Sequence, residues 1–203
     1  MTTHPIGRFT VPTIEEMPHD LQERIRLVNE KLGFVPNVFW TLAHRPNEFR
    51  AFFAYFDALM LREGGLTKAE REMIVVATTA ENHCVYCVVH HSAILRLRAR
   101  DPLIADQIAI NYRRADLSVR QRLMLDFAVK VATESHALCD EDFDTLREHG
   151  FSDDDIWDIG AITAFFAQGS RLANLIGMRP NDEFFALGRT EVPNRGLVAS
   201  GAR

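Results

Sequence analysis

Apolar side chains recur at intervals of three and four residues along most of the chain, which is the spacing of one face of an α-helix. The stripe formed by Leu21, Ile25, Val28 and Leu32 is the first clear example. Alternation of apolar and polar residues with a period of two, which would indicate strands, is absent. The sequence therefore predicts an all-α fold, with helices over residues 20–31, 38–43, 46–60, 68–80, 83–97, 101–110, 118–134, 140–148 and 153–176.

Capping residues locate two of these predicted helix starts. Thr67 is followed three residues later by Glu70, and this capping-box pattern predicts that a helix begins after Thr67. Asn82 is a favourable N-cap residue for the next helix. That cap would place Cys84 inside the first helical turn.

A short pattern recurs 51 residues apart and indicates an internal repeat. It consists of Leu66-Thr67 with Arg71 and Met73, matched by Leu117-Ser118 with Arg122 and Met124. Short helical segments also resemble one another by chance. Two degenerate helical-hairpin repeats and an unrepeated helical fold therefore both stay open.

The chain is expected to have three parts. Residues 1–16 show no clear period and are predicted to form an extended N-terminal arm, residues 17–190 a helical domain, and residues 191–203 a flexible tail. The chain has 203 residues, of which 47% are hydrophobic and 25% charged. This balance is typical of a globular protein that buries a core without disulfide staples.

Charge and hydropathy exclude several classes of function. The net charge is -5 and there is no basic block, so no nucleic-acid partner is expected. No apolar run is long enough to cross a bilayer, and residues 1–34 lack a basic start followed by an apolar core. These features predict a cytoplasmic protein with no membrane partner, in a compartment where structural disulfides are rare.

Two of the three cysteines carry the strongest local signal. Cys84 and Cys87 stand three residues apart, which in a reducing compartment indicates metal binding or redox chemistry. On one helix they would lie a turn apart on the same face, with His91 one turn further along. A thiol near a helix N-terminus and a basic side chain has a lowered pKa and is an activated nucleophile. Glu72, on the preceding helix, is placed to orient His91 or to pass protons to it.

Zinc binding and a thioredoxin-type fold are the competing structural interpretations. Cys84, Cys87, His90 and His91 are all zinc-ligand types, but adjacent histidines point about 100° apart on a helix, and no second ligand pair follows. A thioredoxin motif would follow a strand, and none is predicted before Cys84. The sequence thus predicts neither a metal nor another cofactor. His83 and His90 are expected to be surface or hydrogen-bonding residues, and Cys139 a core thiol.

The spacing of Glu72, Cys84, Cys87 and His91 resembles the signature of the alkylhydroperoxidase AhpD-like group in the carboxymuconolactone decarboxylase superfamily. That signature is a glutamate, eleven residues, C-x-x-C, three residues and a histidine. From Gly33-Phe34-Val35-Pro36-Asn37 to about Met178, the chain also resembles the peroxidase-related branch of this superfamily.

The resemblance implies an all-helical homo-oligomer (a dimer, trimer or hexamer) that reduces hydroperoxides with electrons from a dithiol reductant. It implies that Cys87 is oxidised to a sulfenic acid, that Cys84 is its proton donor and resolving thiol, and that His91 and Glu72 form a proton relay. Tyr86 stands where the best-known member has a histidine, which makes it a candidate for contact with the substrate or the relay.

Helix-dipole reasoning and the resemblance differ over which cysteine is activated. The dipole favours Cys84, which is nearer the N-terminus, whereas proximity to His91 favours Cys87, the choice that we adopt. Two other functions stay open. One is a redox-sensing module that forms the disulfide without turnover, and the other is a lyase of the carboxymuconolactone decarboxylase type, which would not need the cysteines.

Overall fold

The computed structural model describes residues 5–189, and the part of the chain that it describes contains helices and no strands. The helices are α1 (His19–Leu32), α2 (Asn37–Leu42), α3 (Pro46–Met60), α4 (Lys68–Glu81), α5 (Val85–Ala99), α6 (Ile104–Asn111), α7 (Val119–Glu134), α8 (Asp140–Glu148), α9 (Asp153–Ile176) and α10 (Glu183–Ala186). The 3-10 turn η1 (Ile14–Glu16) precedes α1, and the 3-10 turns η2 (Tyr112–Arg114) and η3 (Ser135–Ala137) follow α6 and α7. The predicted all-α fold is confirmed, and only the short α10 had no counterpart in the prediction.

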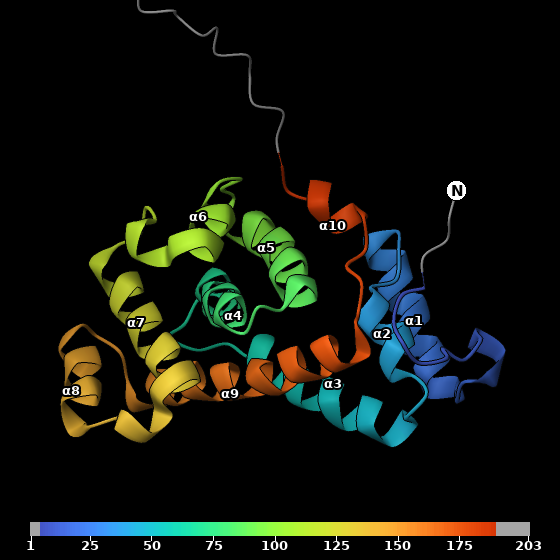
Figure 1. Ribbon diagram of the computed structural model, residues 1–203. Coiled ribbons are helices and arrows are strands. Elements are labelled where there is room, and N and C mark those ends of the chain that lie inside the picture. Colours follow the sequence, from blue (N-terminus) through green and yellow to red (C-terminus); the bar gives the residue numbers. More distant parts are fainter. Residues whose placement is uncertain (1–4, 190–203) are drawn as a thin grey trace, which may run out of the picture.

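Helix α4 lies at the centre of the fold. It contacts α5, α6, α7 and α9, and Figure 1 shows these helices arranged around it. Its consecutive residues Met73, Ile74, Val75, Val76 and Ala77 are all buried. A helix that is apolar on every side has to be enclosed on every side. The connection from α4 to α5 has exposed residues at Glu81 and His83, but Cys84, which follows it, is turned into the interior.

The predicted capping box at Thr67 begins α4, and Ser118 with Gln121 forms a second capping box at the start of α7. The arginine four residues after each cap binds backbone carbonyl groups of the preceding segment. Arg71 donates to the carbonyl of Leu59, and Arg122 donates to the carbonyls of Tyr112 and Ala115. These shared features extend the sequence match between the two segments, and the internal repeat stays a prediction.

A second cluster of apolar side chains holds α1, α2 and α3 together. At its centre the ring of Phe53 stacks on Phe39 at 4.4 Å and tilts against Phe49 at 4.5 Å. Aromatic pairs at these separations contribute more than their buried area alone. This cluster fixes α2 beside the start of α5, so that α2 forms one wall of the region around the cysteines.

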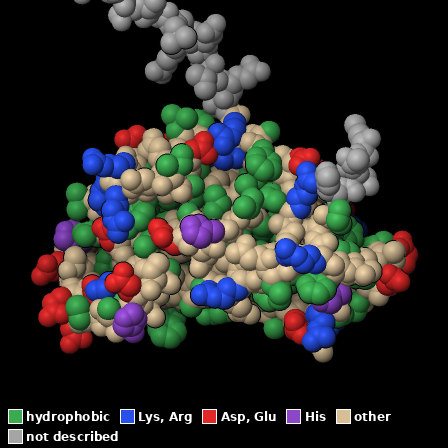
Figure 2. Space-filling view, in the orientation of Figure 1, with side chains coloured by type: hydrophobic (Ala, Val, Ile, Leu, Met, Phe, Trp, Pro, Cys, Tyr) green, Lys and Arg blue, Asp and Glu red, His purple; other side chains and the backbone are tan. Residues whose placement is uncertain are grey.

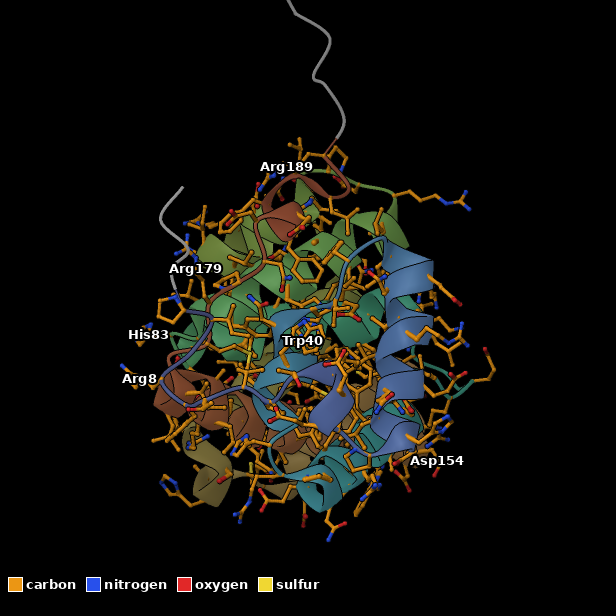
Figure 3. The ribbon with its side chains drawn as sticks, turned by 90° about the vertical axis from the view of Figure 1, so that its right-hand side faces the viewer. Arg8, Trp40, His83, Asp154, Arg179 and Arg189 are labelled. Carbon is orange, nitrogen blue, oxygen red and sulfur yellow. The ribbon has the colours of Figure 1, made fainter. Side chains whose placement is uncertain are left out.

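The N-terminal segment closes the carboxyl end of α9. Residues 5–13 form no helix, and the guanidinium of Arg8 donates to the carbonyls of Asn174 and Leu175. Figure 3 shows Arg8, His83 and Arg179 along the same side of the molecule. A cation at the carboxyl end of a helix complements the unpaired carbonyls there. The predicted division into arm, domain and tail stays a prediction, and residues 1–4 and 190–203 lie outside the described residues.

The surface is mixed in character. On the face shown in Figure 2, acidic, basic and hydrophobic side chains are interspersed. Within residues 5–189, no helix combines the length and the apolar character needed to cross a membrane.

Candidate functional site

The connection between α4 and α5 differs from the sequence prediction at one residue. Asn82 is not the N-cap of α5; it ends α4, where its side chain donates to the carbonyl of Thr78 at 3.0 Å. His83 then adopts a left-handed conformation with φ of 49°. Because this turn reverses the chain, the next helix begins only after Cys84, which is its true N-cap residue.

Cys84 therefore caps the helix with its sulfur. The Sγ atom accepts the backbone N–H of Cys87 at 3.3 Å, in the position that a serine or aspartate oxygen normally takes. The backbone N–H groups of the first turn carry the positive end of the helix dipole. Negative charge on Cys84 is consequently stabilised by the backbone itself.

The two sulfurs of the C-x-x-C pair are in direct contact. Both cysteines are free, and their Sγ atoms lie 2.7 Å apart. Cys84 is 0% exposed and Cys87 is 5% exposed. The walls around them are apolar and come from α2 and from the carboxyl end of α9, with Leu42, Ala173 and Ile176 among the contacts.

This contact gives the two thiols very different pKa values. Hydrogen bonding to Cys87, through its thiol and its backbone N–H, lowers the pKa of Cys84 to about 7 against the opposing effect of burial. The same thiol–thiol contact, together with burial, raises the pKa of Cys87 above its usual range. The reduced pair thus holds one negative charge near neutral pH, placed mainly on Cys84, and it shares the remaining proton.

His91 and Glu72 form a buried hydrogen-bonded pair beside the cysteines. Nδ1 of His91, on α5, lies 2.7 Å from Oε2 of Glu72, on α4, and both side chains are buried. The ring of Phe166 meets the imidazole edge-on at 4.7 Å. The carboxylate fixes which imidazole nitrogen carries the proton and how the ring is oriented. The sequence spacing predicted this approach of Glu72 to His91, and the structure shows it.

Tyr86 is buried in the same wall as the cysteines. Its hydroxyl oxygen accepts the backbone N–H of Val38 at 3.2 Å, so the side chain ties α5 to the start of α2. Burial raises the pKa of Tyr86 well above its ordinary value, and the phenol is therefore neutral at physiological pH. Its position makes Tyr86 a structural link between α5 and α2, and its contact with the substrate or the relay stays a prediction.

His90, which the sequence predicted to be a surface or hydrogen-bonding residue, is half-buried and packs against two rings. Its ring lies between those of His91, at 4.7 Å, and Phe184, at 4.3 Å. Burial, reinforced by His91, holds the pKa of His90 well below its usual range. The cause is α10, which Arg96 holds against α5 by donating to the carbonyls of Phe184 and Leu187. Phe184 lies far along the chain, and no local pattern linked it to the site.

The other two side-chain predictions near this region have opposite outcomes. His83 is exposed, as expected. Cys139 is exposed and is not a core thiol. It occupies the N-cap position of α8, where its N–H donates to the carboxylate of Asp142, and the following Asp140 and Glu141 are exposed with it.

Ser170 is a neighbour of the cysteines that sequence reasoning missed. It lies on α9, is fully buried, and its hydroxyl donates to Sγ of Cys87 at 3.9 Å. A serine two turns from the end of a helix carries no local signal of a site.

Among the residues described, no three His, Cys, Asp or Glu side chains converge in a way that could hold a metal ion.

Comparison with known proteins places this site in a family. The family model of the carboxymuconolactone decarboxylase family matches residues 46–102, which include Glu72, both cysteines and His91. No curated protein sequence matches the chain significantly.

Solved structures extend the likeness to nearly the whole chain. An uncharacterized peroxidase-related protein with an alkylhydroperoxidase AhpD core, from Ralstonia eutropha JMP134, is 64% identical with a TM-score of 0.92; the match covers 93% of this chain and 99% of that chain. An uncharacterized peroxidase-related protein from Silicibacter sp. TM1040 is 39% identical with a TM-score of 0.88, again over 93% and 99%.

A more distant structure shares the fold alone. The debrominase Bmp8 in complex with 2,3,4-tribromopyrrole is 21% identical, with a TM-score of 0.71 over 92% of this chain and 96% of that chain. The two nearer structures each match 93% of this chain at 64% and 39% identity. The chain therefore belongs to the carboxymuconolactone decarboxylase family, in its AhpD-like, peroxidase-related branch.

Proposed function

We propose that the protein is a thiol-dependent peroxidase that reduces hydroperoxides through Cys84 and Cys87. The observation that carries this proposal is the contact of the two sulfurs at 2.7 Å, next to the buried His91–Glu72 pair. Two thiols at this distance form a disulfide with little movement of the chain. The lowered pKa of Cys84 supports the proposal because the thiolate is the reactive form of cysteine.

In this mechanism Cys87 attacks and Cys84 first acts as its base. Cys87 passes its proton across the short contact to the Cys84 thiolate, and the resulting thiolate has the higher pKa and so the greater intrinsic nucleophilicity. It attacks the terminal oxygen of the hydroperoxide: an S–O bond forms, the O–O bond breaks, and the alkoxide leaves as an alcohol after taking a proton. Cys87 is then a sulfenic acid.

Cys84 completes the cycle as the resolving thiol. After losing its proton, its thiolate attacks the sulfur of Cys87: the S–S bond forms, the S–O bond breaks, and hydroxide leaves as water after taking a proton. The pair has then given up two electrons. A dithiol reductant returns them by thiol–disulfide exchange.

His91 and Glu72 act as the proton relay in this proposal. Glu72 binds Nδ1 of His91, which leaves Nε2 free to exchange protons with the thiols or with the departing oxygen. Proton delivery of this kind makes both alkoxide and hydroxide better leaving groups.

Assembly as a homo-oligomer, whether dimer, trimer or hexamer, stays a prediction.

Sustained turnover is the experiment that separates this proposal from its competitors. The reduced wild-type chain, given tert-butyl hydroperoxide and excess dithiothreitol, is expected to consume many equivalents of peroxide per chain. Mass spectrometry after peroxide alone should find a Cys84–Cys87 disulfide. A redox sensor would consume about one equivalent and stop, and a lyase of the decarboxylase type would consume none, so either result contradicts the proposal.

The pH dependence of the first oxidation follows from the shared proton. Above pH 7 the pair carries its negative charge, because the pKa of Cys84 is lowered to about 7. We expect the rate of the single oxidation of reduced protein to be constant above this pH and to fall about tenfold per unit below it. Stopped-flow measurement of thiol loss checks this. An inflection near 9, the ordinary value for a cysteine, would show that the contact does not activate the pair.

A further inference from the structure

Ser170 brings a hydroxyl group from α9 to the cysteines. It lies on the side of α9 that faces the start of α5, it is fully buried, and its Oγ atom is 3.9 Å from Sγ of Cys87. Its chain neighbours Leu172 and Ala173 contribute only apolar atoms to the same wall. A buried hydroxyl in such a wall costs free energy unless it finds a partner.

The hydroxyl of Ser170 is used differently from the hydroxyls of three buried helical threonines. Thr78, Thr79 and Thr163 each donate to the backbone carbonyl four residues earlier in their own helix, at 2.8, 2.7 and 2.8 Å. This is the usual bond of a serine or threonine inside a helix. Within the described part of the chain, the one side-chain hydrogen bond of Ser170 runs to the sulfur of Cys87 instead.

We propose that Ser170 is a positioning residue whose hydroxyl donates to the sulfur of Cys87 and stabilises negative charge on it. The inference rests on the proposed function, in which Cys87 must carry a thiolate when the peroxide arrives. A neutral thiol gains little from a donor, whereas hydrogen bonds to a charged acceptor are about twice as strong as neutral ones. The donor is therefore most effective at the moment of attack.

Two further observations agree with this role. The hydroxyl of Ser170 opposes the rise in the pKa of Cys87 that the Cys84 contact and burial cause. The backbone N–H of Cys87 donates to the sulfur of Cys84 at 3.3 Å. The Ser170 hydroxyl also lowers the pKa of Cys84, but its hydrogen bond is to the sulfur of Cys87.

The test uses a chain in which Cys87 is the sole cysteine, made by Cys84→Ser and Cys139→Ser. The rate of alkylation by iodoacetamide, measured against pH, reports the pKa of Cys87 with no need for peroxide turnover. Adding Ser170→Ala is expected to raise the midpoint by about one pH unit, which is about tenfold less thiolate below the midpoint. We expect no larger shift in the pKa of Cys87, because 3.9 Å is long for a hydrogen bond.

Thr163→Val is the matched control, because it also removes one buried hydroxyl from α9, but one that is bonded to its own helix. The control should leave the midpoint unchanged. An unchanged midpoint with Ser170→Ala, or an equal shift in both variants, would overturn the inference. If the wild-type chain fails to turn over peroxide but Ser170→Ala still shifts the midpoint, the proposed function fails while the hydrogen bond to Cys87 stands.

Discussion

Replacing Cys87 by serine is expected to reduce peroxide consumption with dithiothreitol by roughly a thousandfold or more, because a serine hydroxyl is not ionised at neutral pH and does not attack peroxides. Cys84→Ser should also stop turnover, but for a different reason. Cys87 would still react once and then remain a sulfenic acid, since no thiol lies at the 2.7 Å contact to resolve it.

The two serine variants also identify the attacking sulfur. A dimedone-type trap applied after one equivalent of peroxide should label Cys87 in the Cys84→Ser variant, with the site located by mass spectrometry. Cys139→Ser is the control, because Cys139 is an exposed cap residue of α8 and should be dispensable. Labelling confined to Cys84 in the Cys87→Ser variant would reverse the two roles. Full activity in the double Cys84→Ser, Cys87→Ser variant would contradict the peroxidase itself.

Replacing Asp158 by alanine is expected to cause the largest loss of stability. Its carboxylate binds the guanidinium of Arg71 at 2.8 Å and that of Arg62 at 3.1 Å. The side chain of Arg71 is 0% exposed and that of Asp158 is 2% exposed. Removing one partner of such a pair leaves a buried charge uncompensated, which costs about 3–5 kcal/mol. At about 2–4 °C per kcal/mol for a chain of this size, the melting temperature should fall by roughly 6–20 °C.

Thermal unfolding followed by circular dichroism measures this effect. Asp20→Ala is the matched control, because it breaks an arginine–aspartate pair with Arg50 that is exposed to solvent; its melting temperature should stay close to that of the wild type. A second variant isolates the cause. Arg71→Met combined with Asp158→Leu removes both charges and should be more stable than Asp158→Ala alone. Equal melting temperatures for Asp158→Ala and Asp20→Ala would show that the buried pair does not stabilise the fold.

The helices could be predicted because their signals are local. A period of 3.6 residues, a capping box at Thr67 and a glycine at position 33 act within one or two turns, and the structure reproduces the predicted bounds within a few residues. The error at Asn82 has a local cause as well. Asparagine is favourable at both ends of a helix, and the left-handed turn at His83 decided which end it occupies.

The sequence by itself predicted the all-α fold, the resemblance to the family, and Glu72, Cys84, Cys87 and His91 as candidate site residues, because helical periodicity and a spaced signature are local patterns. Only the tertiary structure decided what surrounds that set. Ser170 on α9 and Phe184 on α10 reach the site across large separations in sequence, and such contacts depend on how helices pack, which no local pattern encodes. The burial of the C-x-x-C pair is likewise a property of the packed chain. So is the lowered pKa of Cys84, which comes from the short sulfur contact and the helix cap.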